Sequence, residues 1–166
     1  MRLDQISFRR AIRGAGIIAA LAMLATSAQA QSGPFAGFAG SWSGNGTVVL
    51  SDGTKERIRC RASYKIDGGG SDLIQSLRCA SDSYKFDLSS NVSSKGDENV
   101  TGTWSETSRN INGNLQGKAR GGHINVFVEA AGFAASLELT TRGNKQSVSI
   151  RSKGEIRDVS ISMIKG

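Results

Sequence analysis

From residue 40 to the C-terminus, apolar and polar side chains alternate with a period of two almost without interruption. Successive side chains of a β-strand point to opposite sides, so this alternation predicts strands with one buried face and one solvated face. Between Ile58 and Ile66 the even positions carry Ile, Cys, Ala, Tyr and Ile, whereas the odd positions carry Arg, Arg, Ser and Lys. The helical period of 3.6 residues appears nowhere after residue 31. The sequence therefore predicts an all-β fold.

Short segments that contain glycine separate the alternating runs. Glycine tolerates the positive φ angles of tight hairpin turns, so each segment indicates a reversal of the chain. Because nearly every connection is short, strands that are neighbours in sequence should pair with each other in space. Closing such an antiparallel up-and-down sheet removes its two edges, and we predict a barrel of about 8–10 strands. The expected strands cover about residues 41–50, 56–66, 72–80, 83–89, 98–105, 111–119, 123–129, 132–140, 146–151 and 158–164.

The two cysteines of the chain lie in the runs on either side of the glycine segment 68–70. If the hairpin centres on Gly69 and Gly70, outward pairing places Cys60 directly opposite Cys79 on the apolar face. Directly opposed residues have Cβ atoms about 4.5–5.5 Å apart, so a small adjustment allows a disulfide. We predict a Cys60–Cys79 disulfide in an oxidising compartment, with two buried thiols as the alternative.

The first thirty residues have the three parts of a secretory signal peptide. A head with four arginines precedes an apolar run at residues 15–25, and Ala28-Gln29-Ala30 supplies the small residues of a cleavage site. The apolar run is too short for a permanent membrane helix, which needs about 20 residues. We therefore expect cleavage after Ala30, a flexible Gly/Ala-rich lead at residues 31–39, and a single barrel domain at 40–166. The predicted location is the periplasm or the extracellular space.

The net charge falls from +7 to +4 when the four arginines and one aspartate of the first thirty residues are removed. Much of the basic character therefore belongs to the predicted signal peptide. The remaining charge is too small to indicate binding to nucleic acid, and we predict no nucleic-acid partner.

Two tripeptides carry a resemblance to known families of barrels. Gly40-Ser41-Trp42 opens the first expected strand and resembles the G-x-W signature of lipocalins and related calycins. Gly102-Thr103-Trp104 repeats the pattern and is similar to a motif of the avidin group. The chain after residue 30 also resembles small, uncharacterised exported proteins of alphaproteobacteria. The resemblance implies a calycin-like barrel with Trp42 as the plug at one end, although the other lipocalin motifs are missing.

A ten-stranded barrel is slightly wider than the eight-stranded barrels that hold side chains or one small ligand. Small residues on the inward face indicate room inside it: Ala62, Gly102, Gly113, Gly117, Ala119 and Ala135. Tyr64, Gln75, Trp104 and Phe133 are the candidate ligand-binding residues, since they combine apolar walls with a few polar groups. Our leading hypothesis is an exported protein that sequesters a small apolar or amphipathic ligand, and a fully packed barrel is the alternative.

The sequence contains few groups suited to catalysis or metal binding. His123 is the single histidine, and together with two cysteines it cannot complete a four-ligand zinc site made of Cys and His. No acidic residue stands at a recognisable catalytic spacing from His123, which we expect to be exposed beside a turn. We predict that the protein is not an enzyme and that it uses no metal and no cofactor.

Two other hypotheses concern macromolecular partners. Arg57, Arg59 and Arg61 share the outward face of one strand, with Arg78 expected opposite Arg61, and this patch suits an anionic glycan of the cell envelope. A solvated edge that resists aggregation is the simpler interpretation. The protein could instead bind another protein, because some bacterial metalloprotease inhibitors are small exported barrels with one disulfide, a G-x-W start and a flexible N-terminal arm. Residues 31–39 would form that arm.

Outer-membrane strands carry girdles of aromatic residues and an apolar band that faces lipid. Here aromatics are few, and the outward positions are Ser, Arg, Lys, Asn and Glu. We therefore predict that the chain is not a transmembrane protein, although a barrel turned inside out remains formally compatible with the alternation.

Overall fold

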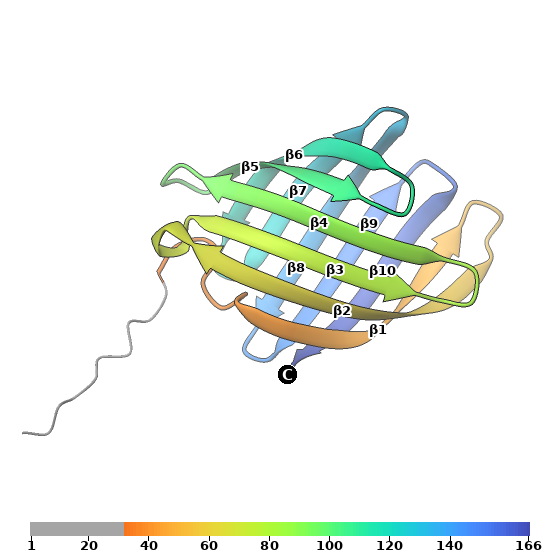
Figure 1. The fold of residues 1–166 in the computed structure, drawn as a ribbon, viewed down its shortest axis with the longest axis horizontal. Coiled ribbons are helices and arrows are strands. Elements are labelled where there is room, and N and C mark those ends of the chain that lie inside the picture. Colours follow the sequence, from red (N-terminus) through yellow and green to blue (C-terminus); the bar gives the residue numbers. More distant parts are fainter. Residues whose placement is uncertain (1–31) are drawn as a thin grey trace, which may run out of the picture.

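The computed structural model describes residues 32–166, so the predicted signal peptide lies outside the described residues. Figure 1 shows one closed barrel of ten antiparallel strands, in which each strand pairs with its sequence neighbours and β1 pairs with β10. This arrangement confirms the predicted all-β up-and-down barrel. Within the described part of the chain, no helix has the length and apolar character needed to cross a membrane. The strands are β1 (Gly40–Leu50), β2 (Lys55–Asp67), β3 (Asp72–Ala80), β4 (Lys85–Ser94), β5 (Asn99–Glu106), β6 (Ile111–Arg120), β7 (His123–Ala130), β8 (Phe133–Arg142), β9 (Lys145–Ser152) and β10 (Ile156–Lys165).

The alternation predicts correctly which side chains point inward. In β2, Ile58 and Cys60 are buried in the barrel, whereas Arg59 and Arg61 between and beside them are exposed. The inside-out arrangement is therefore not adopted. The core consists of these inward side chains from all ten strands.

Strand β4 shows the largest difference from the expected boundaries, because it continues to Ser94 instead of ending at residue 89. The inward positions near its end include Ser90 and Ser94, which are buried but polar. Each hydroxyl is satisfied, since Ser90 donates to the side-chain oxygen of Gln75 and Ser94 donates to the carbonyl oxygen of Asp97. Buried serines break the apolar pattern on which the prediction depended.

The predicted disulfide is confirmed. Cys60 and Cys79 are directly opposed in the pairing of β2 with β3, and they form a disulfide bond. The turn between these strands, Gly68–Gly70, has positive φ at all three residues, at 60°, 69° and 105°. Only glycine adopts such a succession without strain, so the turn sets the register that brings the two cysteines together.

Several glycines inside strands lie where the backbone of the next strand approaches closely. A Cβ at Gly117 would overlap the carbonyl oxygen of Asn125, and one at Gly113 would overlap that of Glu129. Gly102 is crowded in the same way by Asn91. Glycine within a strand marks such tight bends of a barrel. The expectation that these glycines leave space for a ligand is therefore wrong, because neighbouring backbone fills the space.

The segment before β1 packs against the barrel and is not the flexible lead that the sequence suggested. Residues 34–38 form turns, and the side chains of Phe35 and Phe38 are both 0% exposed. Gly33 and Gly70 approach so closely that a Cβ on Gly33 would lie 2.7 Å from the carbonyl oxygen of Gly70. Two phenylalanines within a Gly/Ala-rich sequence are enough to anchor the segment, because burying each one contributes about 1.5–3 kcal/mol.

The two ends of the barrel differ in how well they are sealed. At the closed end, where the N-terminal segment packs, Trp42 is 1% exposed and its indole N–H donates to the carbonyl oxygen of Phe38 at 2.9 Å. At the opposite end, which we call the open end, Leu50, Phe86, Phe133 and Ile156 are only partly buried. The structure thus has an apolar interior that is covered on one side only.

We expect the Cys60→Ala/Cys79→Ala double variant to unfold at lower denaturant concentration than the unmodified protein. Closing the chain between residues that are 19 positions apart reduces the entropy of the unfolded state, which corresponds to about 3 kcal/mol. Urea unfolding without reductant measures the difference. Reductant should lower the stability of the unmodified protein by a similar amount and leave the double variant unchanged. Equal midpoints for the two proteins would contradict this expectation.

A second prediction concerns the interior glycines. Gly117→Ala should lower the free energy of unfolding by about 1–3 kcal/mol, because the added methyl group overlaps the backbone of β7 at Asn125 and Val126. Gly154→Ala is the matched control, since the nearest atom to its Cβ would be the Ser152 hydroxyl oxygen at 3.7 Å. Urea unfolding curves of both variants provide the comparison, and an undiminished stability of Gly117→Ala would rule out the close approach.

Candidate ligand cavity and outer groove

A cavity of about 300 Å³ lies inside the barrel. Its walls are mainly aliphatic and aromatic side chains that come from β2 to β10. The lining also includes Arg109, Gly154 and Glu155 from turns at the open end, and no residue from the turns at the closed end. The cavity therefore extends towards the open end. None of the small inward residues that suggested it belongs to its lining, so the cavity reflects the width of a ten-stranded barrel.

The four residues predicted to contact a ligand all line this cavity. Tyr64, Gln75, Trp104 and Phe133 come from β2, β3, β5 and β8 respectively. The rings of Trp104 and Phe133 pack edge to face with centroids 5.7 Å apart. Their contact with a ligand stays a prediction. Trp42 does not line the cavity and lies at the closed end, as the resemblance to calycins implied.

A chain of three buried polar side chains closes the inner part of the cavity. The Tyr64 hydroxyl donates to Gln146 at 2.9 Å, and the Gln146 amide donates to the Thr141 hydroxyl at 2.9 Å. Burial raises the pKa of the Tyr64 phenol above its ordinary value, and the hydrogen bond to Gln146 opposes this only in part. The phenol thus stays neutral and holds the cavity wall in one arrangement.

A second polar pair lies further along the cavity. Ser90 donates its hydroxyl proton to the side-chain oxygen of Gln75 at 2.9 Å. The amide N–H₂ of Gln75 makes no hydrogen bond to the residues that the structure describes. Because an amide of this kind offers two donors, Gln75 provides a polar contact among mainly apolar lining residues.

At the open end, Glu106 holds the turn between β5 and β6 in place. This residue is 5% exposed, and its carboxylate accepts hydrogen bonds from the backbone N–H groups of Asp87, Ser108 and Arg109 at 3.0, 3.1 and 2.7 Å. Burial opposes ionisation, but the three N–H donors outweigh it and lower the pKa of Glu106 below its ordinary value. Glu106 therefore serves a structural role at the rim of the cavity.

The same turn places a cation beside the opening. The guanidinium carbon of Arg109 lies 5.0 Å from the centroid of the Phe86 ring, which itself stacks on Tyr84 at 6.2 Å. Neither Glu106 nor Arg109 was selected as a site residue from the sequence. Glu106 continues the inward-facing series of β5 but is charged where the pattern predicts an apolar side chain, and Arg109 lies in a turn.

His123 is exposed at the start of β7, with Nδ1 3.2 Å from the hydroxyl oxygen of Thr140. Within residues 32–166, no three His, Cys, Asp or Glu side chains are grouped closely enough to hold a metal ion.

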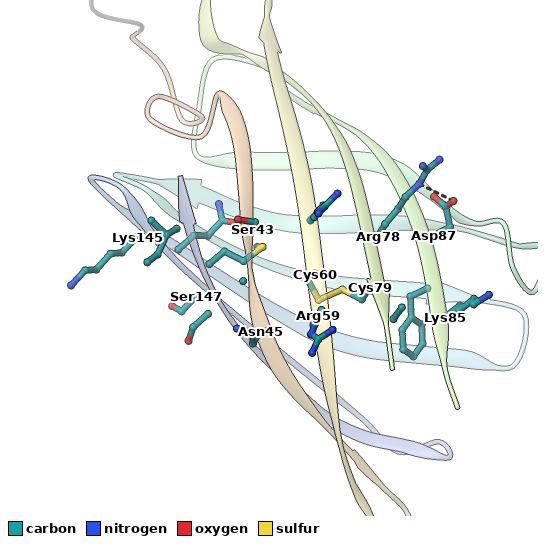
Figure 2. A pocket seen from close by; sticks show the side chains of 18 of the residues that line it. Ser43, Asn45, Arg59, Cys60, Arg78, Cys79, Lys85, Asp87, Lys145 and Ser147 are labelled. Carbon is teal, nitrogen blue, oxygen red and sulfur yellow. Dashed lines mark ion pairs between the residues drawn. A yellow bond between two sulfur atoms is a disulfide. The ribbon is translucent and has the colours of Figure 1, made fainter. Parts of the chain in front are cut away.

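An open groove of about 1330 Å³ follows the outside of the barrel. We call it the outer groove, and Figure 2 shows its residues on both sides of the Cys60–Cys79 disulfide. Arg59, Arg61 and Arg78 of the predicted anion patch contribute to it, whereas Arg57 is exposed on the same strand but does not line it. The structure adds three basic residues from other strands that the sequence did not connect with the patch: Lys85, Arg142 and Lys145.

The fold and the cavity define a class: a calycin-like β-barrel with an internal apolar cavity. Among solved structures, Rv2717c from M. tuberculosis is similar with a TM-score of 0.63 at 12% identity, over 78% of this chain and 92% of that protein. The S-type phycobiliprotein lyase CPES from Guillardia theta is similar with a TM-score of 0.53 at 10% identity, over 77% of this chain and 88% of the lyase. These likenesses concern the fold. No protein-family model matches the chain, and no curated protein matches it either.

Glu106→Gln should lower the free energy of unfolding at pH 7 by about 1–3 kcal/mol, because an amide nitrogen would face a backbone N–H group. The folded-state pKa lies below the ordinary value of 4.5, so this contribution is complete above pH 4.5 and disappears as the pH falls through the lowered pKa. Urea unfolding over a pH series from 7 downwards should show the difference between the two proteins shrinking as the pH falls below 4.5. The exposed Glu138→Gln serves as the control, and a difference that does not shrink as the pH falls below 4.5 would contradict the assigned role.

Proposed function

We propose that this protein binds a small, mainly apolar molecule inside its barrel and releases it unchanged. The observation that carries the proposal is the cavity of about 300 Å³, which is lined by apolar side chains and reached from the open end. Pockets for small ligands begin at about this volume and combine apolar walls with a small number of polar groups. Transfer of an apolar molecule of this size from water into the cavity lowers the free energy.

The polar groups of the cavity indicate the kind of molecule. Gln75 lines the cavity and donates no hydrogen bond to the described residues, whereas Tyr64 and Ser90 already use their hydroxyl protons within the protein. A ligand that covers the Gln75 amide without accepting its hydrogen bond would lose about 1–3 kcal/mol. We therefore propose a ligand with an apolar body and one hydrogen-bond acceptor, such as a carbonyl or hydroxyl oxygen.

The hydrogen bonds of the polar residues Tyr64 and Glu106 agree with binding without catalysis. Tyr64 is held by Gln146, and the Glu106 carboxylate is occupied by backbone N–H groups. Groups fixed in such structural hydrogen bonds are poorly placed to transfer protons to a substrate. One protein of similar fold is named a phycobiliprotein lyase, which supports the binding of another molecule by such a barrel and not the absence of catalysis.

We also propose that the protein is exported. The Cys60–Cys79 disulfide supports this, because disulfides persist mainly in oxidising compartments. The alternative function as a protease inhibitor depended on a free N-terminal arm. The burial of Phe35 and Phe38 favours the cavity instead, since it ties residues 32–39 to the closed end.

The test introduces a tryptophan at one of two adjacent positions of β8, one facing the cavity and one facing the outside. Leu137 of β8 lines the cavity, and the adjacent Ser136 points outward and is exposed. Leu137→Trp should weaken uptake of the fluorescent probe N-phenyl-1-naphthylamine at least tenfold, because the larger ring occupies the space of the ligand. Ser136→Trp introduces the same residue on the outer face and should bind the probe as the unmodified protein does.

Probe fluorescence on titration with each protein measures the affinity, and circular dichroism verifies that both variants retain the β-sheet spectrum. Equal affinities for the two tryptophan variants would show that the probe binds elsewhere. The absence of probe uptake by the unmodified protein would contradict the proposed function itself.

A further inference from the structure

The outer groove contains an unusual concentration of positive charge. After residue 31 the chain has 17 basic and 13 acidic residues, so its basic and acidic groups are nearly balanced. The groove is lined by six basic residues and by one acidic residue, Asp87. Its net charge of +5 exceeds the +4 of that whole stretch of chain, which means that the remaining surface is slightly acidic.

Most of these cations have no partner within the described residues. Arg78 pairs with Asp87, with Nε 3.1 Å from the carboxylate, as the dashed line in Figure 2 shows. The three other ion pairs of the described chain lie outside the groove. Arg59 and Arg61, together with Lys85, Arg142 and Lys145, thus project from exposed positions without a carboxylate within 4.0 Å.

The groove also brings like charges directly opposite each other. Arg61 faces Arg78 across β2 and β3, and Arg142 faces Lys145 across β8 and β9. These are the two direct pairs of Lys or Arg among the strand registers of the described chain, and both lie in the groove. Such pairs destabilise a sheet by a fraction of a kcal/mol each. A bound polyanion would offset this repulsion, so the paired like charges are consistent with a surface that binds a polyanion.

We propose that the outer groove binds an acidic polysaccharide. Guanidinium groups form paired hydrogen bonds with carboxylate or sulfate groups, and arginine provides four of the six cations. Between them lie exposed Ser43, Asn45 and Ser147, which Figure 2 places along the same groove. Hydroxyl and amide side chains of this kind can exchange hydrogen bonds with sugar hydroxyls.

The extent of the groove favours a polymer, and its composition favours a glycan over single-stranded nucleic acid. The groove runs across the outside of the barrel from β8 through the β10–β1 junction to β4, which suits an extended polymer better than a single ion. Phe86 is the one aromatic residue in its lining. Proteins that bind single-stranded nucleic acid generally supply several aromatic side chains on which the bases stack.

The experiment compares two variants with the same change in net charge. The groove variant is Arg59→Gln/Arg61→Gln/Lys145→Gln. The control variant, Lys118→Gln/Lys153→Gln/Arg157→Gln, changes three exposed basic residues that do not line the groove. Polygalacturonate is the acidic probe, dextran is the neutral probe, and single-stranded DNA is the competing polyanion.

We expect the unmodified protein to bind polygalacturonate at low ionic strength and to bind dextran at least tenfold more weakly. The groove variant should lose at least tenfold in affinity for polygalacturonate, whereas the control variant should lose less than threefold. Binding should weaken as salt is added, because exposed charges are screened. Calorimetric titration gives the affinities, and thermal unfolding verifies that both variants are folded.

Three outcomes would overturn the proposal. Equal losses in the two variants would show attraction to the overall charge, and tighter binding to DNA than to polygalacturonate would assign the groove to nucleic acid. A failure to bind either polyanion would show that the outer groove is only a solvated charged surface. The cavity variant Leu137→Trp should bind polygalacturonate normally, so this test is independent of the proposed interior ligand.

Discussion

The pairing of β1 with β10 is the contact on which the rest of the structure depends. The other nine strand pairs are hairpins whose partners are joined by a short turn, whereas this pair joins the two ends of the barrel. Gly44 lies opposite Met163 and Gly46 lies opposite Ile161, and a Cβ at either glycine would overlap the backbone of β10. The absence of these side chains lets the two strands approach. Without that junction the sheet would have two free edges and no enclosed interior.

Closure alone does not make a ligand site, and the N-terminal segment supplies what is missing. Phe35, Phe38 and Trp42 fill one end of the barrel with fully buried side chains. The Tyr64–Gln146–Thr141 hydrogen bonds complete this end without leaving a buried polar atom unsatisfied among the described residues. At the open end, Glu106 holds a turn at the rim while apolar side chains stay partly accessible. A ligand bound in the interior would therefore enter and leave through the open end.

The sequence was sufficient for the features that depend on local periodicity and turn chemistry. Alternation identified the strands, and the glycine turn at 68–70 placed Cys60 opposite Cys79. It also selected Tyr64, Gln75, Trp104 and Phe133 as inward candidate residues, and all four line the cavity. The interior glycines were misinterpreted, because a missing side chain can mean free space or a neighbouring backbone, and sequence does not distinguish these.

Long-range features were harder to predict for a related reason. No turn connects β10 to β1, so no local signal sets the register that brings Lys145 and Arg142 to the side of Arg59. The Gly/Ala content of the N-terminal segment predicts a flexible lead, but the burial of its two phenylalanines determines where the segment lies. The N–H groups that lower the pKa of Glu106 come from Asp87 of β4 and from the turn after β5, and alternation does not predict such hydrogen bonds.

The geometry of a strand explains how one wall can serve two independent sites. Cys60 and Tyr64 of β2 point into the barrel, while Arg59 and Arg61 on the same strand point to the outer groove. Because alternate side chains face opposite sides, a substitution on the outer face leaves the inner packing unchanged. The disulfide between β2 and β3 fixes the wall between the two faces. A ligand in the cavity and a polymer in the groove would therefore contact mostly different side chains, with Cys79 and Phe86 in the lining of both.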